Sequence, residues 1–137
     1  AYFSDKDINY SYSGIYHNSR KYTTQINEIK EKVEEVFNKK FNSVLLNRYK
    51  DGHDWHGYHS DNEKVLGHKI DVCSINFGAP RDFIFKSKID NKKKIINLKN
   101  GSALYMMHPT QINYYHSLPR RTRVKNERIN LTFRYIN

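Results

Sequence analysis

The residues with the clearest capacity for chemistry are His59 and Asp61, which stand in the triplet His-Ser-Asp. On an extended backbone, side chains two residues apart project to the same side, so this pair can offer two adjacent ligands to one metal ion. The best candidate for a third ligand is His116, in the run INYYHSLP. Two histidines and one carboxylate on one face of an iron ion leave three positions open for co-substrate and dioxygen, as in non-haem Fe(II) oxygenases. Because a His-x-Asp triplet alone is often a chance occurrence, the prediction of a metal site needs support from the rest of the chain.

A second candidate group lies in the segment 128–134, which reads RINLTFR. In a strand, alternate residues share a face, so one face carries two guanidiniums, an amide and a hydroxyl, from Arg128, Asn130, Thr132 and Arg134. Two arginines aimed inward would form a pocket for a dianion, because the guanidinium fork suits carboxylates. An exposed edge strand with ordinary surface arginines would show the same pattern, and both interpretations stay open at this point.

The composition indicates one basic domain. The chain has 137 residues, a reasonable size for a single compact domain over residues 1–137. Its 24 Lys and Arg residues against 14 acidic ones give a formal net charge of +10, which favours a nucleic-acid partner. Solubility, or the codon bias of an AT-rich genome, would explain the same excess. The 11 tyrosines can both pack and stack on bases.

The single cysteine, Cys73, rules out an internal disulfide and favours an intracellular protein, nuclear in a eukaryote and otherwise cytoplasmic. No apolar run has the length of a membrane span, and no signal-peptide pattern opens the chain, so we expect no membrane association. We expect a monomer. Because the sequence begins at Ala1 rather than Met, we also expect the natural protein to carry upstream residues.

One helix is predicted over Thr24–Lys40. Its apolar residues recur at spacings of three and four, at Ile26, Ile29, Val33, Val36 and Phe37. Thr23 or Thr24 can cap its start. We interpret this helix as scaffold that covers a sheet.

The remaining signals are those of short strands. The segment Asn9–Ser13 is predicted to be extended, either as an edge strand that packs Tyr10 and Tyr12 on the core or as a flap over a base. Asn100-Gly101 is a tight-hairpin signal, because both residues tolerate positive φ. The other predicted strands are Ser43–Tyr49, Ile70–Phe77, Asp82–Phe85, Ile95–Leu98, Ala103–Met107, Gln111–Ser117 and Arg128–Ile136. A mainly β chain with one flanking helix favours a jelly-roll sandwich or squashed barrel.

Five segments resemble, in order and spacing, the AlkB family of Fe(II)/2-oxoglutarate-dependent dioxygenases: NRYKDG, HSDNE, INFGAPRDFIF, MMHPTQINYYHSLP and ERINLTFR. The resemblance is closest to the eukaryotic duplex-DNA repair branch and extends from about Tyr10 to Tyr135. It implies a double-stranded β-helix with the iron at its open end.

The resemblance also implies roles for individual residues. His59, Asp61 and His116 match the iron ligands. The positions that match 2-oxoglutarate contacts are Asn47, Tyr49, Arg128, Asn130, Thr132 and Arg134. In the family, the residue matching Arg128 clamps the distal carboxylate, and the one matching Arg134 lies near the carboxylate that chelates iron. His53 and His56 are rival ligands by type, but neither has an acid two residues on.

The reaction implied is oxidative demethylation of 1-methyladenine and 3-methylcytosine in DNA. It couples decarboxylation of 2-oxoglutarate to hydroxylation of the methyl group by dioxygen, and formaldehyde is released. Tyr10 and Tyr12 match the lid over the base, and Glu63 matches a base contact. The chain departs from the branch at Asn62, which matches a second, base-contacting acid of the family, so an amide that can still accept a hydrogen bond replaces a charge. Residues 1–9 show no match to the aromatic wedge of the branch.

Three alternatives remain at the sequence level. The same fold could act on methylated RNA or single-stranded DNA. A catalytically silent nucleic-acid-binding relative would keep the fold without turnover. A zinc domain could use His53, His56 and His59, but the chain lacks paired-ligand spacing and has only one cysteine.

Overall fold

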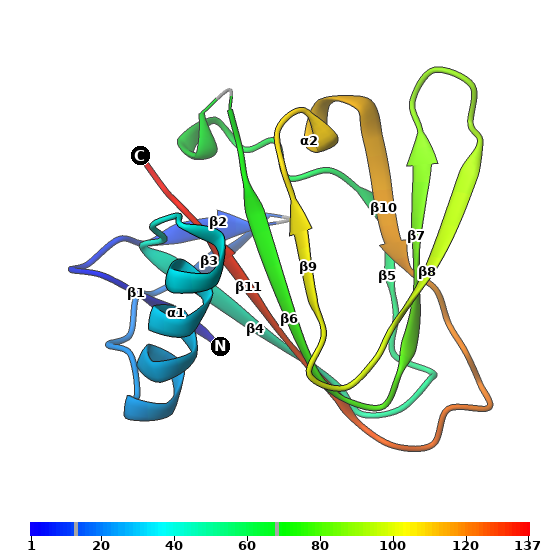
Figure 1. The fold of residues 1–137 in the computed structure, drawn as a ribbon, viewed down its shortest axis with the longest axis horizontal. Coiled ribbons are helices and arrows are strands. Elements are labelled where there is room, and N and C mark those ends of the chain that lie inside the picture. The colour runs from blue at the N-terminus through cyan, green and yellow to red at the C-terminus, as the bar shows by residue number, and fades with distance from the viewer. Residues whose placement is uncertain (13, 68) are drawn as a thin grey trace.

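Two β-sheets face each other, and a helix covers the outer face of the larger one (Figure 1). This computed structural model describes residues 1–12, 14–67 and 69–137, so Ser13 and His68 lie outside the described residues. The larger sheet has the strand order β1-β4-β11-β6-β9, and the smaller one β5-β10-β7-β8. A separate two-stranded sheet pairs β2 with β3. The expected jelly-roll core with one flanking helix is confirmed.

The strands of the larger sheet are β1 (Tyr2–Ser4), β4 (Ser43–Tyr49), β6 (Val72–Gly78), β9 (Ala103–Met106) and β11 (Arg128–Arg134). Those of the smaller sheet are β5 (His56–His59), β7 (Arg81–Ser87), β8 (Lys93–Leu98) and β10 (Tyr114–Leu118). The remaining elements are β2 (Tyr10–Tyr12), β3 (Ile15–His17), α1 (Thr24–Phe37), the short 3₁₀ turn Lys64–Leu66 and α2 (Thr110–Asn113).

Helix α1 begins at a side-chain cap and ends at a residue with left-handed backbone geometry. The Thr23 hydroxyl accepts a hydrogen bond from the backbone N–H of Ile26 at 3.2 Å, as an N-cap does. The helix ends at Phe37, three residues before the predicted end, because Asn38 adopts the left-handed conformation with φ 51°. The predicted apolar stripe is only partly buried, since Val36 is exposed.

The structure has two apolar cores, one on each face of the larger sheet. Leu131 and Phe133 face α1 and pack in one core with Val33 and Val44. The other core lies between the two sheets and includes Leu45, Val72, Phe83 and Leu118. Strand β11 pairs with β4 on one side and β6 on the other. It is therefore a central strand, which excludes the exposed-edge interpretation of its arginines.

Two expectations about the strands were wrong, and one strand was missed. Asn100-Gly101 forms a turn but no hairpin, because β8 pairs with β7 while β9 pairs with β6, so the turn carries the chain from one sheet to the other. The predicted strand Gln111–Ser117 starts as the short helix α2, and β10 begins only at Tyr114. Strand β5, which carries His59, was not predicted as a separate strand.

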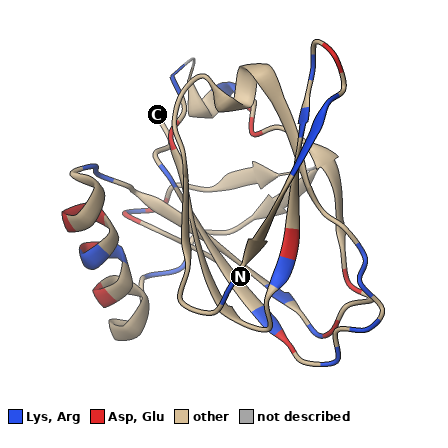
Figure 2. Cartoon of the chain, turned by 45° about the vertical axis from the view of Figure 1, so that its right-hand side comes forward, with Lys and Arg blue, Asp and Glu red and all other residues tan. Residues whose placement is uncertain are grey.

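Lys and Arg residues cluster on the β7–β8 hairpin and on the loops at the end away from α2 (Figure 2). Within the described residues, no helix has both the length and the apolar character needed to cross a membrane.

Candidate active site

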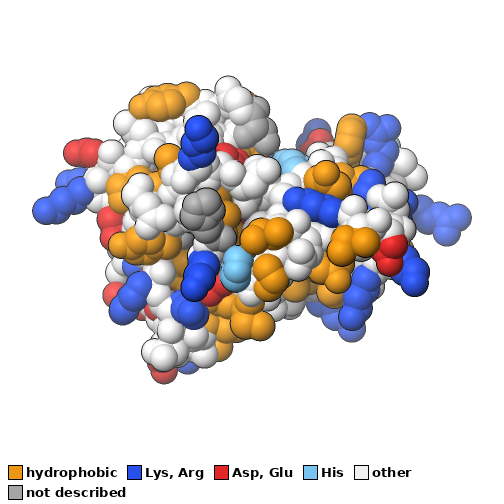
Figure 3. All heavy atoms as spheres, turned by 90° about the horizontal axis from the view of Figure 1, so that it is seen from above, with side chains coloured by type: hydrophobic (Ala, Val, Ile, Leu, Met, Phe, Trp, Pro, Cys, Tyr) orange, Lys and Arg blue, Asp and Glu red, His pale blue; other side chains and the backbone are white. Residues whose placement is uncertain are grey.

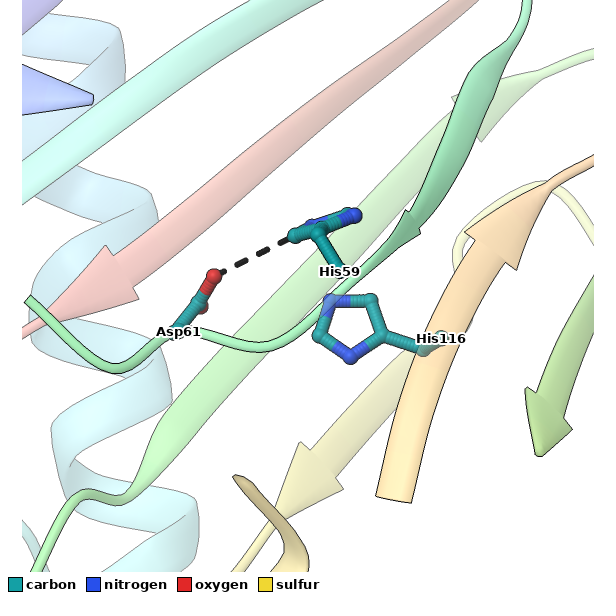
Figure 4. A group of neighbouring side chains, drawn as sticks. All are labelled: His59, Asp61 and His116. Carbon is teal, nitrogen blue, oxygen red and sulfur yellow. Dashed lines mark ion pairs between the residues drawn. The ribbon is translucent and has the colours of Figure 1, made fainter. Parts of the chain in front are cut away.

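The pairing of two strands brings the histidines together. His59 ends β5 and is the register partner of His116 in β10, and their ring centroids lie 4.2 Å apart. Asp61 follows β5 after one intervening residue, and its carboxylate points toward His59 (Figure 4). One potential ligand atom from each of the three residues lies within 4.8 Å of the other two. This geometry can hold one metal ion and leaves part of its coordination sphere to other ligands.

Asp61 is buried and tightly oriented. Its Oδ2 accepts a hydrogen bond from Nε of Arg134 at 3.0 Å and forms an ion pair with Nη2 of the same residue at 2.9 Å. Its backbone N–H donates to the side-chain carbonyl of Gln111 in α2 at 2.8 Å. Oδ1 has no hydrogen-bond partner among the described residues and lies 3.9 Å from Nε2 of His59. One carboxylate oxygen is thus anchored while the other faces the histidines.

The protonation states suit metal binding. Burial lowers the pKa of His116 to about 3 and also lowers that of His59, so both rings are neutral at neutral pH. Burial opposes ionisation of Asp61, but the nearby Arg134, His116 and His59 outweigh it and hold the pKa of that carboxyl below its usual value. His59 donates from Nδ1 to the Gly57 carbonyl at 2.8 Å, which leaves Nε2 unprotonated, with a lone pair that faces the Tyr12 hydroxyl at 3.0 Å and can bind a metal ion.

A cavity of ≈ 480 Å³, including its open mouth, adjoins the three ligands. It brings together all the predicted co-substrate positions, which are Asn47, Tyr49, Arg128, Asn130, Thr132 and Arg134. Apolar side chains of Phe83, Met106 and Leu118 form another part of its wall. Strand β11 supplies four of these residues because its alternate side chains point between the sheets.

Arg128 is the cation in this cavity that lacks an acidic partner among the described residues. Its guanidinium is 2% exposed, donates to Oδ1 of Asn76 and lies 5.3 Å from the centroid of the Tyr49 ring. Nε has no hydrogen-bond partner within the described chain. Burial lowers the pKa of Arg128 to about 10, so the group remains cationic at neutral pH. A buried cation with an unused donor fits a carboxylate ligand.

Asn76 and Ser74 of β6 complete this polar wall, although sequence reasoning missed both. Asn130 donates to Oδ1 of Asn76 at 3.0 Å, and Thr132 donates to the Asn130 side-chain oxygen at 2.8 Å. The signal was present, since Ser74 and Asn76 alternate with apolar residues in a strand that pairs with β11. Without the pairing, however, two small polar residues in a strand indicate no ligand.

The four expected base contacts lie in different environments. Tyr12 lines the cavity, whereas Tyr10 is 2% exposed and packs in the core beneath it, with their rings 6.1 Å apart. Both rings lie over the Arg134 guanidinium. Burial raises the pKa of Glu63, whose Oε2 has no partner among the described residues. Asn62 is exposed and does not line the cavity.

The alternative zinc site is not assembled in the described structure. His53 is exposed and its Nδ1 lies 3.1 Å from Oδ1 of Asp51. His56 does line the cavity, with its ring centroid 4.0 Å from that of His59. It is not part of the three-residue group whose ligand atoms converge.

Comparison with known proteins decides the family. The model of the 2OG-Fe(II) oxygenase superfamily matches residues 3–134. The chain belongs to this superfamily. Within it the chain belongs to the AlkB family, because it is 40% identical over 99% of its length to mouse "DNA oxidative demethylase ALKBH2" and 38% identical to the bovine protein of the same name. The chain spans 60% of the mouse protein and 52% of the bovine one.

Two further similarities extend this result. "Uncharacterized protein R406" of Acanthamoeba polyphaga mimivirus is 33% identical over 98% of the chain, which spans 70% of that protein. The solved structure titled "The structure of OsALKBH1" superimposes with a TM-score of 0.67 and covers 86% of this chain and 66% of its own, at 18% identity. That likeness supports the fold.

Membership of the superfamily implies Fe(II) and 2-oxoglutarate as cofactor and co-substrate. The described residues fit both. The unpartnered Oδ1 of Asp61 beside two neutral histidines matches the donor set for Fe(II). The unpartnered Nε of buried Arg128 matches a carboxylate group.

Proposed function

We propose that this chain is the catalytic region of a DNA demethylase that removes methyl groups from base nitrogens, with 1-methyladenine and 3-methylcytosine as substrates. One observation carries the proposal: a His-Asp-His group and a buried arginine that has no acidic partner in the described part of the chain share one cavity. The relatives named DNA oxidative demethylase, 38% to 40% identical over 99% of this chain, support the substrate class.

We assign His59, Asp61 and His116 as the Fe(II) ligands and Arg128 as the residue that binds the distal carboxylate of 2-oxoglutarate. When bound, iron with 2-oxoglutarate and dioxygen supplies the oxidising chemistry that hydroxylates the methyl group and releases formaldehyde. The chain orients the ligands: Arg134 and Gln111 hold Asp61, and the Gly57 carbonyl directs the His59 ring. Phe83, Met106 and Leu118 limit water on the apolar wall.

The substrate enters as a base turned out of the nucleic acid. A base methylated on its pairing edge cannot pair, so its extrusion costs less than that of an intact base. Tyr12 stands at the cavity, where its ring can lie against the extruded base. Seen from above, Lys and Arg side chains surround this face, with apolar side chains between them (Figure 3). That charge suits the phosphate backbone of either DNA or RNA.

The proposal is tested by mass spectrometry of a 1-methyladenine DNA oligonucleotide incubated with the protein, Fe(II), 2-oxoglutarate and ascorbate. We expect the mass of the unmethylated strand together with succinate and formaldehyde, and none of these with Asp61→Ala. The same lesion is compared in single-stranded DNA, duplex DNA and RNA at one salt concentration. Turnover on RNA alone would replace the DNA assignment, and oligonucleotide binding without succinate would identify a silent relative.

A further inference from the structure

A single hydroxyl links the lid to two histidines. Tyr12 of β2 places its hydroxyl oxygen 3.0 Å from Nε2 of His56 and 3.0 Å from Nε2 of His59. Strand β2 pairs with β3 in a two-stranded sheet and its Tyr10 packs in the core, whereas the Tyr12 hydroxyl has no hydrogen-bond partner among the described residues other than these two histidines. His56 is half-buried and lines the same cavity as the three proposed ligands.

The hydrogen-bond partners of the two imidazole rings indicate which ring nitrogens carry a proton. The Nδ1 atoms of His56 and His59 both face the Gly57 carbonyl oxygen, at 3.1 and 2.8 Å. A carbonyl oxygen only accepts, so in each ring the proton sits on Nδ1 and Nε2 is an acceptor. The Tyr12 hydroxyl has one proton and faces two acceptors. In the metal-free protein it can satisfy only one of them.

A metal ion removes this conflict. When the ion binds Nε2 of His59, that lone pair is used, and the Tyr12 hydroxyl is left with Nε2 of His56 as its acceptor. Metal binding then costs the protein no hydrogen bond, because the hydroxyl changes partner instead of losing one. If His56 could not accept, the same event would leave a half-buried hydroxyl without its partner.

We propose that His56 is a positioning residue that holds Tyr12, and with it the lid strand β2, against the cavity once a metal ion occupies His59. The inference rests on the proposed role of His59 as a ligand and is independent of which methylated base is the substrate. His56 itself binds no metal in this arrangement. It acts only through the Tyr12 hydroxyl.

Metal affinity provides the first test, because it needs neither nucleic acid nor turnover. Mn(II) is titrated calorimetrically into metal-free wild type, His56→Leu, Tyr12→Phe and the double variant. We expect His56→Leu to weaken Mn(II) binding roughly threefold to tenfold, the equivalent of about one net hydrogen bond. The double variant should bind like Tyr12→Phe, because without a hydroxyl there is no hydrogen bond for metal binding to break. Equal affinities of wild type and His56→Leu, or equal weakening in the double variant, would overturn the proposal.

Hydrogen–deuterium exchange of the lid gives a second, structural measurement. In His56→Leu, Mn(II) should accelerate exchange in segments 10–12 and 15–17, whereas in wild type it should not. His56→Gln offers a side-chain oxygen as acceptor and should restore wild-type behaviour, which a purely structural role would not do. His56→Ala replaces His56→Leu if the latter fails to fold. If Mn(II) leaves the exchange rates of segments 10–12 and 15–17 unchanged in every variant, the proposal is wrong.

Two matched controls and one separate check complete the experiment. His53→Leu removes an exposed histidine from the preceding turn, and Tyr16→Phe removes an exposed hydroxyl from β3, so neither should alter metal affinity or lid exchange. His59→Ala tests the ligand assignment itself. If wild type bound no Mn(II), the proposed function would fail. If it bound Mn(II) and His56→Leu were unaffected, only the role of His56 would fail.

Discussion

Arg128 and Arg134 occupy equivalent positions in the alternation of β11 but have different environments. Arg134 is bound to the Asp61 carboxylate through two nitrogens, so its charge is already paired. Arg128 has only Asn76 as a hydrogen-bond partner among the described residues. The sequence pattern suggested that both arginines receive one dianion. We therefore propose Arg128 as the main carboxylate-binding residue, while Arg134 orients the proposed metal ligand Asp61.

Arg128→Lys should therefore weaken 2-oxoglutarate use selectively. Lysine keeps the charge but loses the planar fork, and a charge-assisted hydrogen bond in a buried site contributes about 1.5–3 kcal/mol. We expect the 2-oxoglutarate concentration for half-maximal succinate formation to rise roughly 10- to 100-fold. Oligonucleotide affinity, measured by fluorescence anisotropy, should stay unchanged. A parallel loss of oligonucleotide affinity would instead place Arg128 on the nucleic-acid surface.

His116 should make the metal-free protein less stable in mild acid. The folded protein keeps this ring neutral down to about pH 3, whereas the unfolded chain takes up a proton at the ordinary pKa of 6.5. The unfolded state binds more protons in this window, so the free energy of unfolding falls as the pH drops, by up to about 1.4 kcal/mol per pH unit. The low pKa of Asp61 adds a loss only below its ordinary value of 3.8.

Urea unfolding of the metal-free protein near pH 7 and near pH 5 measures this effect. His116→Leu cannot take up a proton in either state, so its stability should fall less between the two pH values than that of the wild type. His59, whose pKa is also lowered by burial, should retain a smaller dependence in that variant. Parallel curves for the two proteins would show that His116 is protonated in the folded state.

At the scale of elements, the loop between β4 and β5 is hydrogen-bonded to the loop between β10 and β11, at the end of the sandwich away from α2. The backbone N–H of Gly52 donates to the Val124 carbonyl at 2.8 Å, and that of Arg121 donates to the Gly52 carbonyl at 2.8 Å. Buried Arg81 of β7 donates to backbone carbonyls of Asp51, Asp54 and Pro119. These bonds fix the ends of β4, β5, β10 and β11, which carry the site.

Gly52→Ala should destabilise the protein strongly. A Cβ built on Gly52 would lie 1.6 Å from the Arg121 carbonyl oxygen, so one of the two loops must move. We expect a loss of roughly 2–4 kcal/mol in the free energy of unfolding, as in severe overpacking. Gly101→Ala is the control, since a Cβ there meets open space and costs only the strain of its positive φ, about 1–2 kcal/mol. Equal losses in thermal unfolding would show that the two loops separate easily.

At the scale of the molecule, the lysine-rich β7–β8 hairpin and helix α1 lie on different sides of the sandwich (Figures 1 and 2). This arrangement favours nucleic-acid binding at the hairpin end.

The triple variant Lys92→Glu, Lys93→Glu, Lys94→Glu should bind oligonucleotides more weakly and with less salt dependence. For each lysine–phosphate ion pair that the variant removes, the slope of log affinity against log salt should fall by about 0.9 on duplex DNA. Lys32→Glu on the exposed face of α1 is the control and should leave the slope unchanged. Anisotropy titrations over a range of salt concentrations measure both. An unchanged slope in the triple variant would move the nucleic-acid surface elsewhere.

The sequence by itself determined what depends on near neighbours in the chain. The His59–Asp61 spacing, the Thr23 cap and the alternation of β11 follow from local backbone geometry, so each was predictable. The order of the five matching segments likewise pointed to the AlkB family, which the comparisons confirm. Even the strand Ser43–Tyr49 was predicted with its observed bounds.

Only the tertiary structure decided which residues meet across long separations. It paired β5 with β10, so His59 faces His116. It also made Asn100-Gly101 a connection between the two sheets and not a hairpin turn within one sheet. In addition, it paired Arg134 with the Asp61 carboxylate, left Arg128 with no acidic partner among the described residues, and placed His56 within hydrogen-bond distance of Tyr12. The physical reason is that such contacts reflect the competition of all strands for partners and of all charges for counter-ions, which no local pattern encodes.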